Sequence, residues 1–165
     1  GNDVNIIDLA LDEFDPVMGT EEWQVYMNRA GEVPAGLEKY VQLISEAEIL
    51  VFVYPTWWSG VPAQLKGWFD RILVPGVAFS FSDDGRVRPA LAHAKRMFIV
   101  TTYGSPKLYV RLVNDNGRRL ISRALRIATM KRARVTHLGL YKMDKATVIE
   151  RREFLQKIEK TLAGV

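Results

Sequence analysis

The chain of 165 residues has the make-up of an ordinary soluble domain, with 48% hydrophobic and 25% charged residues. Its longest apolar run is far shorter than the roughly 20 residues that a membrane-spanning helix needs, so no membrane span is predicted. The absence of cysteine excludes disulfides and thiolate chemistry and fits a cytoplasmic protein. No shift in composition marks a second domain, and residues 1–165 are therefore predicted to form one.

The net charge of +4 is unevenly placed along the chain. Between Lys107 and Arg134 nine basic residues stand against one acid, Asp115. Such a stripe is typical either of a solvated helix face or of a surface that attracts a phosphate-bearing cofactor or nucleic acid. The interleaved aromatic and basic residues of a nucleic-acid-binding module are missing, so no nucleic acid partner is predicted.

Strands and helices are predicted to alternate from the start of the chain. Residues 3–9 read as a strand, followed by a short helix from Thr20 and a second helix around residues 37–44. Residues 49–53 are an unbroken apolar run, which is typical of a strand buried on both faces. Such alternation favours a parallel sheet covered by helices.

Two adjacent tryptophans, Trp57 and Trp58, follow this strand on a short loop, and a helix with one apolar face comes next at about residues 62–72. In open α/β sheets, ligands bind outside the carboxyl ends of the strands. The indoles are expected either to fold back into the core or to form a flat wall for a planar ligand, whose polar edge would bond to loop N–H groups.

The second half of the chain continues the alternation. Residues 74–81 are predicted to be extended, with a turn at residues 82–85, and residues 96–102 form the next buried strand. A helix over residues 108–130, interrupted near 114–117, precedes a last strand at 134–140. The final helix, from about Thr147 to Leu162, is expected to face inward with Val148, Phe154, Leu155, Ile158 and Leu162.

The stretch from residue 55 to residue 71 resembles the signature of the flavodoxin-like NAD(P)H:quinone oxidoreductases. The resemblance implies an α/β flavodoxin-like three-layer sandwich with a parallel sheet in the order 2-1-3-4-5. It also implies a homodimer that transfers a hydride from NAD(P)H, through FAD or FMN, to a quinone-like acceptor. The shared pattern is met at Pro55, Trp57, Trp58, Gly60, Pro62, Ala63, Leu65, Lys66, Gly67, Trp68, Phe69, Asp70 and Arg71.

The resemblance also implies two loops that hold the flavin and two aromatic residues that reach a partner subunit's site. Phe79 and Phe81 stand at the positions of these aromatics, although packing within the chain is the alternative. Tyr103 replaces a glycine of the second loop, so a positive φ there would be disfavoured. The expected flavin-binding residues are Pro55, Thr56, Trp57, Trp58 and Ser59 on the first loop and Thr101, Thr102, Tyr103 and Gly104 on the second.

Tyr109 matches a tyrosine that relatives place near the flavin, and it is the candidate catalytic residue, acting by stacking or by a hydrogen bond. Six residues on, animal quinone reductases have a histidine partner, but this chain has Asp115, so a Tyr–His relay is not expected. The two histidines, His93 and His137, have no evident carboxylate companion in the sequence, and no metal site is predicted.

The beginning of the chain departs from the family. Residue 1 falls just before the family's second strand, so the first strand and the phosphate loop are expected to be absent from this sequence. Either the natural N-terminal part is missing or the lineage has lost it. A second hypothesis for function is an accessory, regulatory subunit of a potassium-efflux transporter, with the basic stripe as its docking surface.

Overall fold

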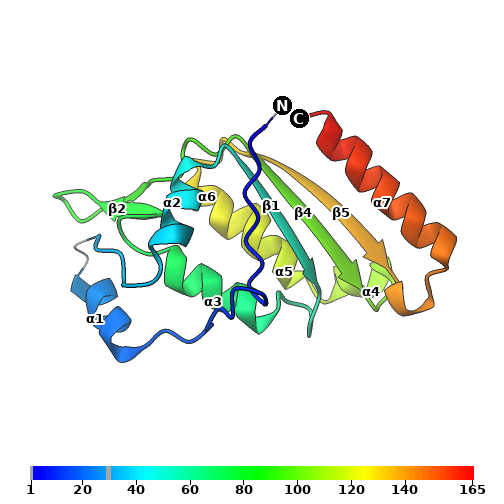
Figure 1. The fold of residues 1–165 in the computed structure, drawn as a ribbon, viewed down its shortest axis with the longest axis horizontal. Coiled ribbons are helices and arrows are strands. Elements are labelled where there is room, and N and C mark those ends of the chain that lie inside the picture. Colours follow the sequence, from blue (N-terminus) through cyan, green and yellow to red (C-terminus); the bar gives the residue numbers. More distant parts are fainter. Residues whose placement is uncertain (1, 29–30) are drawn as a thin grey trace.

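The computed structural model describes residues 2–28 and 31–165 (Figure 1). The strands are β1 (Ile49–Pro55), β2 (Phe79–Phe81), β3 (Val87–Pro89), β4 (Arg96–Tyr103) and β5 (Arg134–Tyr141). The parallel sheet has the order β1-β4-β5, which agrees with the last three strands of the predicted 2-1-3-4-5 sheet, while β2 and β3 form a separate antiparallel hairpin. The predicted α/β class and parallel sheet are therefore confirmed.

Helices occupy the connections between the strands, as predicted, and the long helical stretch is broken near residues 113–115. No helix in the described part of the chain has the length and apolar character that a bilayer crossing requires. The helical elements are α1 (Thr20–Asn28), α2 (Glu38–Glu46), α3 (Ala63–Ile72), α4 (Lys107–Leu112), α5 (Asn116–Arg119), the π-helical segment η1 (Leu120–Leu125), α6 (Arg126–Ala128), the 3-10 turn η2 (Met143–Lys145) and α7 (Val148–Ala163).

The core lies between the inward face of the sheet and helices α2 and α3. Alternate residues of β1 point into it, and the ring of Phe52 meets that of Phe69 on α3 edge-on, with centroids 5.5 Å apart. The central strand β4 is flanked on both edges, and its residues Met97 to Thr101 are all buried. This buried central strand carries the candidate site at its carboxyl end.

The prediction that β1 is buried on both faces is wrong. Its outward residues Val51 and Val53 are 43% and 73% exposed. Helix α7 lies along β5 (Figure 1), and within residues 2–28 and 31–165 no helix covers the outward face of β1. An apolar run marks a strand but does not reveal whether a second layer covers it.

The predicted strand over residues 3–9 is also wrong, because this segment has no neighbouring strand to pair with in the described structure. A β-strand requires a partner for its N–H and C=O groups. The side chains of Val4 and Ile6 are correspondingly 72% and 82% exposed.

Helix α7 begins where it was predicted, but its apolar face is only half covered. Thr147 caps the helix, since its hydroxyl accepts a hydrogen bond from the Glu150 N–H while the Glu150 carboxylate accepts one from the Thr147 N–H. Of the residues predicted to face inward, Val148 and Leu155 are exposed. The others, Phe154, Ile158 and Leu162, are half-buried.

Candidate functional site

The site is built at the carboxyl ends of β1 and β4, where two loops leave the sheet side by side. The ladder pairs Tyr54 with Thr101 and Pro55 with Thr102. One residue further, the Thr56 N–H donates to the Thr102 carbonyl at 2.9 Å, and the hydroxyl oxygens of Thr56 and Thr101 lie 3.1 Å apart. The strand register therefore continues into the loops and fixes their separation.

The first loop makes a tight turn over residues 57–60. The Trp57 N–H donates to the Gly60 carbonyl at 3.1 Å, and the Gly60 N–H donates back to the Trp57 carbonyl at 2.8 Å. The two central residues, Trp58 and Ser59, have φ values of 45° and 60°, which is the pattern of a type I′ turn. Such positions favour glycine or asparagine, so the turn stores backbone strain at the sheet edge.

A second turn holds this strained turn in place. The Gly117 N–H donates to the Ser59 carbonyl at 3.3 Å, and a Cβ atom at Gly117 would come within 3.0 Å of the Gly60 carbonyl carbon. Only a residue without a side chain allows this close approach without a shift of the loop. The glycine thus joins the start of α5 to the tryptophan turn.

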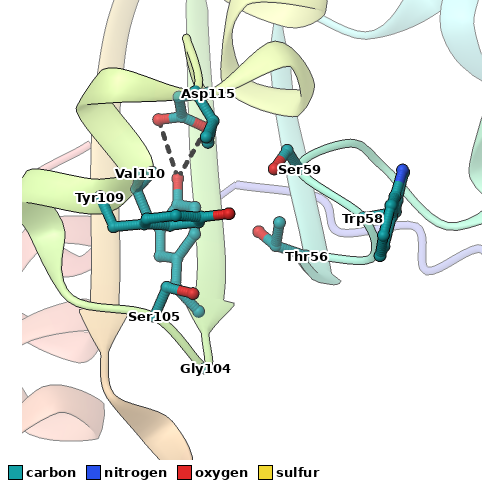
Figure 2. Close-up of a pocket in the computed structure, with 10 residues that line it drawn as sticks. Thr56, Trp58, Ser59, Gly104, Ser105, Tyr109, Val110 and Asp115 are labelled. Carbon is teal, nitrogen blue, oxygen red and sulfur yellow. Dashed lines mark hydrogen bonds between the residues drawn. The ribbon is translucent and has the colours of Figure 1, made fainter.

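Between the two loops lies a cavity of about 340 Å³, which we call the strand-end cavity. Figure 2 shows Tyr109 on one side, with its hydroxyl directed toward Thr56 and Ser59 on the other. The aromatic rings and hydroxyl groups that line the cavity suit a flat ligand with polar edges. The lining residues are Thr56, Trp58, Ser59, Tyr103, Gly104, Ser105, Tyr109, Val110, Val113 and Asp115.

Both indoles are on the surface, which excludes the alternative in which they fold back into the core. Trp57 is 67% exposed and Trp58 is fully exposed. Of the two, Trp58 lines the cavity and Trp57 does not.

The remaining expected flavin-binding residues divide into two groups. Thr56, Ser59, Tyr103 and Gly104 line the cavity together with the candidate catalytic residue Tyr109. The others are not part of its wall: they are Pro55, Thr101 and Thr102.

Phe79 and Phe81 lie apart from this cavity. Their rings stand on one face of β2 with centroids 5.7 Å apart, and Phe79 borders a separate apolar hollow of about 210 Å³. The hairpin projects at the left of the view, away from the carboxyl ends of β1 and β4 (Figure 1). Their predicted role at a partner subunit's site stays a prediction.

The wall of the cavity contains a buried polar cluster that the sequence did not reveal. The Tyr103 hydroxyl lies 3.1 and 3.0 Å from the two carboxylate oxygens of Asp115, as Figure 2 shows. The Arg118 Nε–H donates to the same carboxylate at 2.8 Å, and His137 Nε2 lies 3.2 Å from the Tyr103 hydroxyl. Asp115 thus contacts Tyr103 rather than Tyr109. His137 is therefore linked to a carboxylate, that of Asp115, but only through the hydroxyl of Tyr103.

Burial and the Asp115 charge determine the protonation of this cluster. Burial raises the pKa of Tyr103 and of Tyr54, and the nearby carboxylate raises the pKa of both further, so both phenols keep their protons. The Tyr54 hydroxyl is buried and has no hydrogen-bond partner among the described residues. Burial lowers the pKa of His137, while the charge of Asp115 opposes this shift.

We expect acid to destabilise the fold through His137. Because its pKa is lower in the folded chain than the ordinary value of 6.5, the unfolded state binds more protons just below pH 6.5. Its contribution to stability is therefore present above pH 6.5 and is lost as the pH falls. In urea denaturation from pH 7 to 5, a His137→Gln variant should lose stability less steeply, by less than about 1.4 kcal/mol per pH unit. An identical slope in the variant would contradict this assignment.

Comparisons with known proteins agree with the geometry. The sequence pattern of a family described as having a flavodoxin-like fold matches residues 1–162. A solved structure, Smu.1420 from Streptococcus mutans UA159, superposes with a TM-score of 0.82 at 28% identity and covers 96% of this chain and 81% of that one.

Curated relatives match a part of the chain. An uncharacterized NAD(P)H oxidoreductase of Haemophilus influenzae is 36% identical over 106 residues, which are 63% of this chain and 50% of the relative. The human ribosyldihydronicotinamide dehydrogenase [quinone] is 34% identical over 104 residues, 61% of this chain and 42% of the relative. The matched segment thus spans about half the length of these relatives.

Proposed function

Because the chain belongs to the flavodoxin-like fold family, we propose that it binds the ring of a flavin, FAD or FMN, in the strand-end cavity. Bound flavin supplies two-electron transfer from NAD(P)H to a quinone-like acceptor. The names of the curated relatives, an NAD(P)H oxidoreductase and a quinone-linked dehydrogenase, support this choice of donor and acceptor. A cytoplasmic location stays a prediction from the cysteine-free sequence.

The observation that carries the proposal is the strained turn. No described residue accepts a hydrogen bond from the N–H of Trp58 or of Ser59, and both residues line the cavity. Successive N–H groups in a turn of this kind form a site for negative charge. They would stabilise the charge that a flavin ring acquires on reduction. The hydroxyls of Thr56 and Ser105 add hydrogen-bonding groups for the polar ring edge.

Tyr109 is proposed to act on the acceptor side. It is 53% exposed and lines the cavity, so its ring would limit access to one face of the flavin. NAD(P)H and the acceptor would then approach the flavin one after the other, on the single face that stays accessible. In a homodimer, Phe79 and Phe81 are proposed to complete the cavity of the partner subunit. Their rings are half-buried and lie on an outlying hairpin, which supports this role.

Replacing Trp58 with alanine is expected to weaken flavin binding about 2- to 13-fold, because a stacked aromatic pair contributes roughly 0.5–1.5 kcal/mol. The measurement is titration of the protein with FMN and FAD, followed by flavin fluorescence. The matched control is Trp23→Ala, since Trp23 is also an exposed tryptophan, at 51%, but lies on α1, away from the cavity lining. Equal losses in the two variants would count against the cavity as the flavin site.

Turnover separates the enzymatic role from the regulatory one. Purified protein that shows flavin absorbance and consumes NAD(P)H when a quinone is added acts as proposed. Flavin bound without turnover would instead favour a regulatory subunit. Protein that binds neither FMN nor FAD would remove the redox assignment.

A further inference from the structure

We propose that His137, Tyr103 and Asp115 form a proton relay that supplies the acceptor in the strand-end cavity with a proton from solvent. The inference rests on the proposed function and adds a path for proton transfer, which the proposed function does not include. Its basis is one continuous line of hydrogen bonds, from a half-buried imidazole on the outer strand β5 to a carboxylate in the cavity wall.

The reaction needs such a supply. NAD(P)H gives up one hydrogen together with two electrons, whereas a quinone that becomes a hydroquinone takes up two electrons and two protons. One proton per turnover therefore comes from water. Asp115 is the only carboxylic acid among the residues that line the cavity, so it is the group placed to hand over that proton.

The geometry fixes the direction of each hydrogen bond. Asp115 is 6% exposed and its carboxylate also accepts from Arg118, so the Tyr103 hydroxyl is the donor to Asp115. The oxygen of Tyr103 then accepts from the Nε2–H of His137 at 3.2 Å. A proton that arrives on His137 can pass to the Tyr103 oxygen as the Tyr103 proton moves to Asp115.

The transfer ends at the acceptor. The Asp115 O–H bond breaks and a new O–H bond forms on the reduced acceptor, which leaves the carboxylate paired with Arg118 as before. The proton that His137 takes from water on Nδ1 replaces the one that it passes on from Nε2, so the imidazole ends neutral. Exchange of the Nδ1 hydrogen with water, which the half-buried position of the ring allows, restores the Nε2–H form.

Packing holds the central residue of the relay in place. Tyr103 is 2% exposed, and its ring stacks on that of Tyr141 with centroids 4.7 Å apart and an interplanar angle of 4°. The charged groups that act on His137 are Asp115, which favours its protonation, and Arg118 and Lys107, which oppose it. The rate at which the relay delivers protons should therefore decline as the pH rises through the pKa of His137, which burial keeps below its ordinary value.

The test compares Tyr103→Phe, which removes only the central hydroxyl, with Tyr141→Phe, which makes the same change on the stacked neighbouring ring. In flavin-free protein, NMR titration should show that Asp115→Asn lowers the His137 pKa, with His93 as internal reference, because the charge that favours the imidazolium is gone. An unchanged His137 pKa would overturn the coupling on which the relay depends.

In flavin-loaded protein, the two half-reactions are followed separately by stopped flow. We expect Tyr103→Phe and His137→Gln to slow oxidation of the reduced protein by a quinone at least about tenfold, with loss of its pH dependence. Reduction by NAD(P)H should be slowed much less than oxidation in both variants, and Tyr141→Phe should resemble the parent protein in both steps. Oxidation at the parent rate in Tyr103→Phe would overturn the relay alone, whereas a parent protein that NAD(P)H cannot reduce would overturn the proposed function and the relay with it.

Discussion

Replacing Ile99 with alanine is expected to lower the free energy of unfolding by about 3–4 kcal/mol. Ile99 is fully buried in the middle of the central strand β4, where it pairs with Phe52 of β1 on one side and with His137 of β5 on the other. Both neighbouring strands hold the backbone in place, so the structure cannot collapse into the cavity that the missing atoms leave. The denaturation midpoint in urea, at an unchanged slope, measures the loss.

The matched control is Val53→Ala on β1. Val53 is also an aliphatic strand residue, but it is 73% exposed, so its truncation leaves no cavity. A loss below about 1 kcal/mol is expected, arising from strand propensity alone. A Val53 variant that is destabilised as much as the Ile99 variant would mean that the outward face of β1 is covered in solution.

The difference between these two residues marks a limit of the sequence. Periodicity and apolar runs were sufficient to predict β1, β4 and β5, because each of these segments carries the local apolar pattern of a buried strand. Coverage of a face depends on other parts of the chain, and residues 49–53 look the same whether or not a helix lies over them. The failed strand at residues 3–9 has the same origin, since pairing is a property of the neighbouring strand.

Much of the candidate site was predictable, because its loops follow directly from strand ends. Parallel strands bring their carboxyl ends to one sheet edge, so the tryptophan loop and the threonine loop had to lie side by side. The type I′ turn could not be foreseen, because Trp58 and Ser59 carry none of the glycine or asparagine signals of such turns.

The Tyr103–Asp115 pair was hidden for a related reason. Its members are 12 positions apart, and they meet only because the turn before α5 folds back onto the strand ends through Gly117 and Ser59. Asp115 itself adopts a left-handed backbone conformation with a φ of 46°, which was not predicted from the sequence.

Replacing Gly67 with alanine is expected to destabilise the fold by about 2–3 kcal/mol, although alanine is the better helix former by up to about 1 kcal/mol. A Cβ atom at Gly67 of α3 would lie 2.3 Å from the carbonyl oxygen and 2.4 Å from the Cα of Pro16. Since these are backbone atoms, a side-chain rotation cannot relieve the clash. The glycine therefore serves close approach between α3 and the segment before α1.

That segment cannot move away freely. Arg71, one turn further along α3, donates to the Asp15 carbonyl and pairs with Glu22 on α1, so a shift of Pro16 would disturb both contacts. The control is Gly19→Ala, because a Cβ atom there would meet nothing within 4 Å. Its free energy of unfolding, measured by urea denaturation, should stay within about 0.5 kcal/mol of that of the parent protein. Equal stability of the two variants would show that the segment around Pro16 does not pack on α3. The place of the neighbouring Phe14 in the hydrophobic core would then be wrong as well.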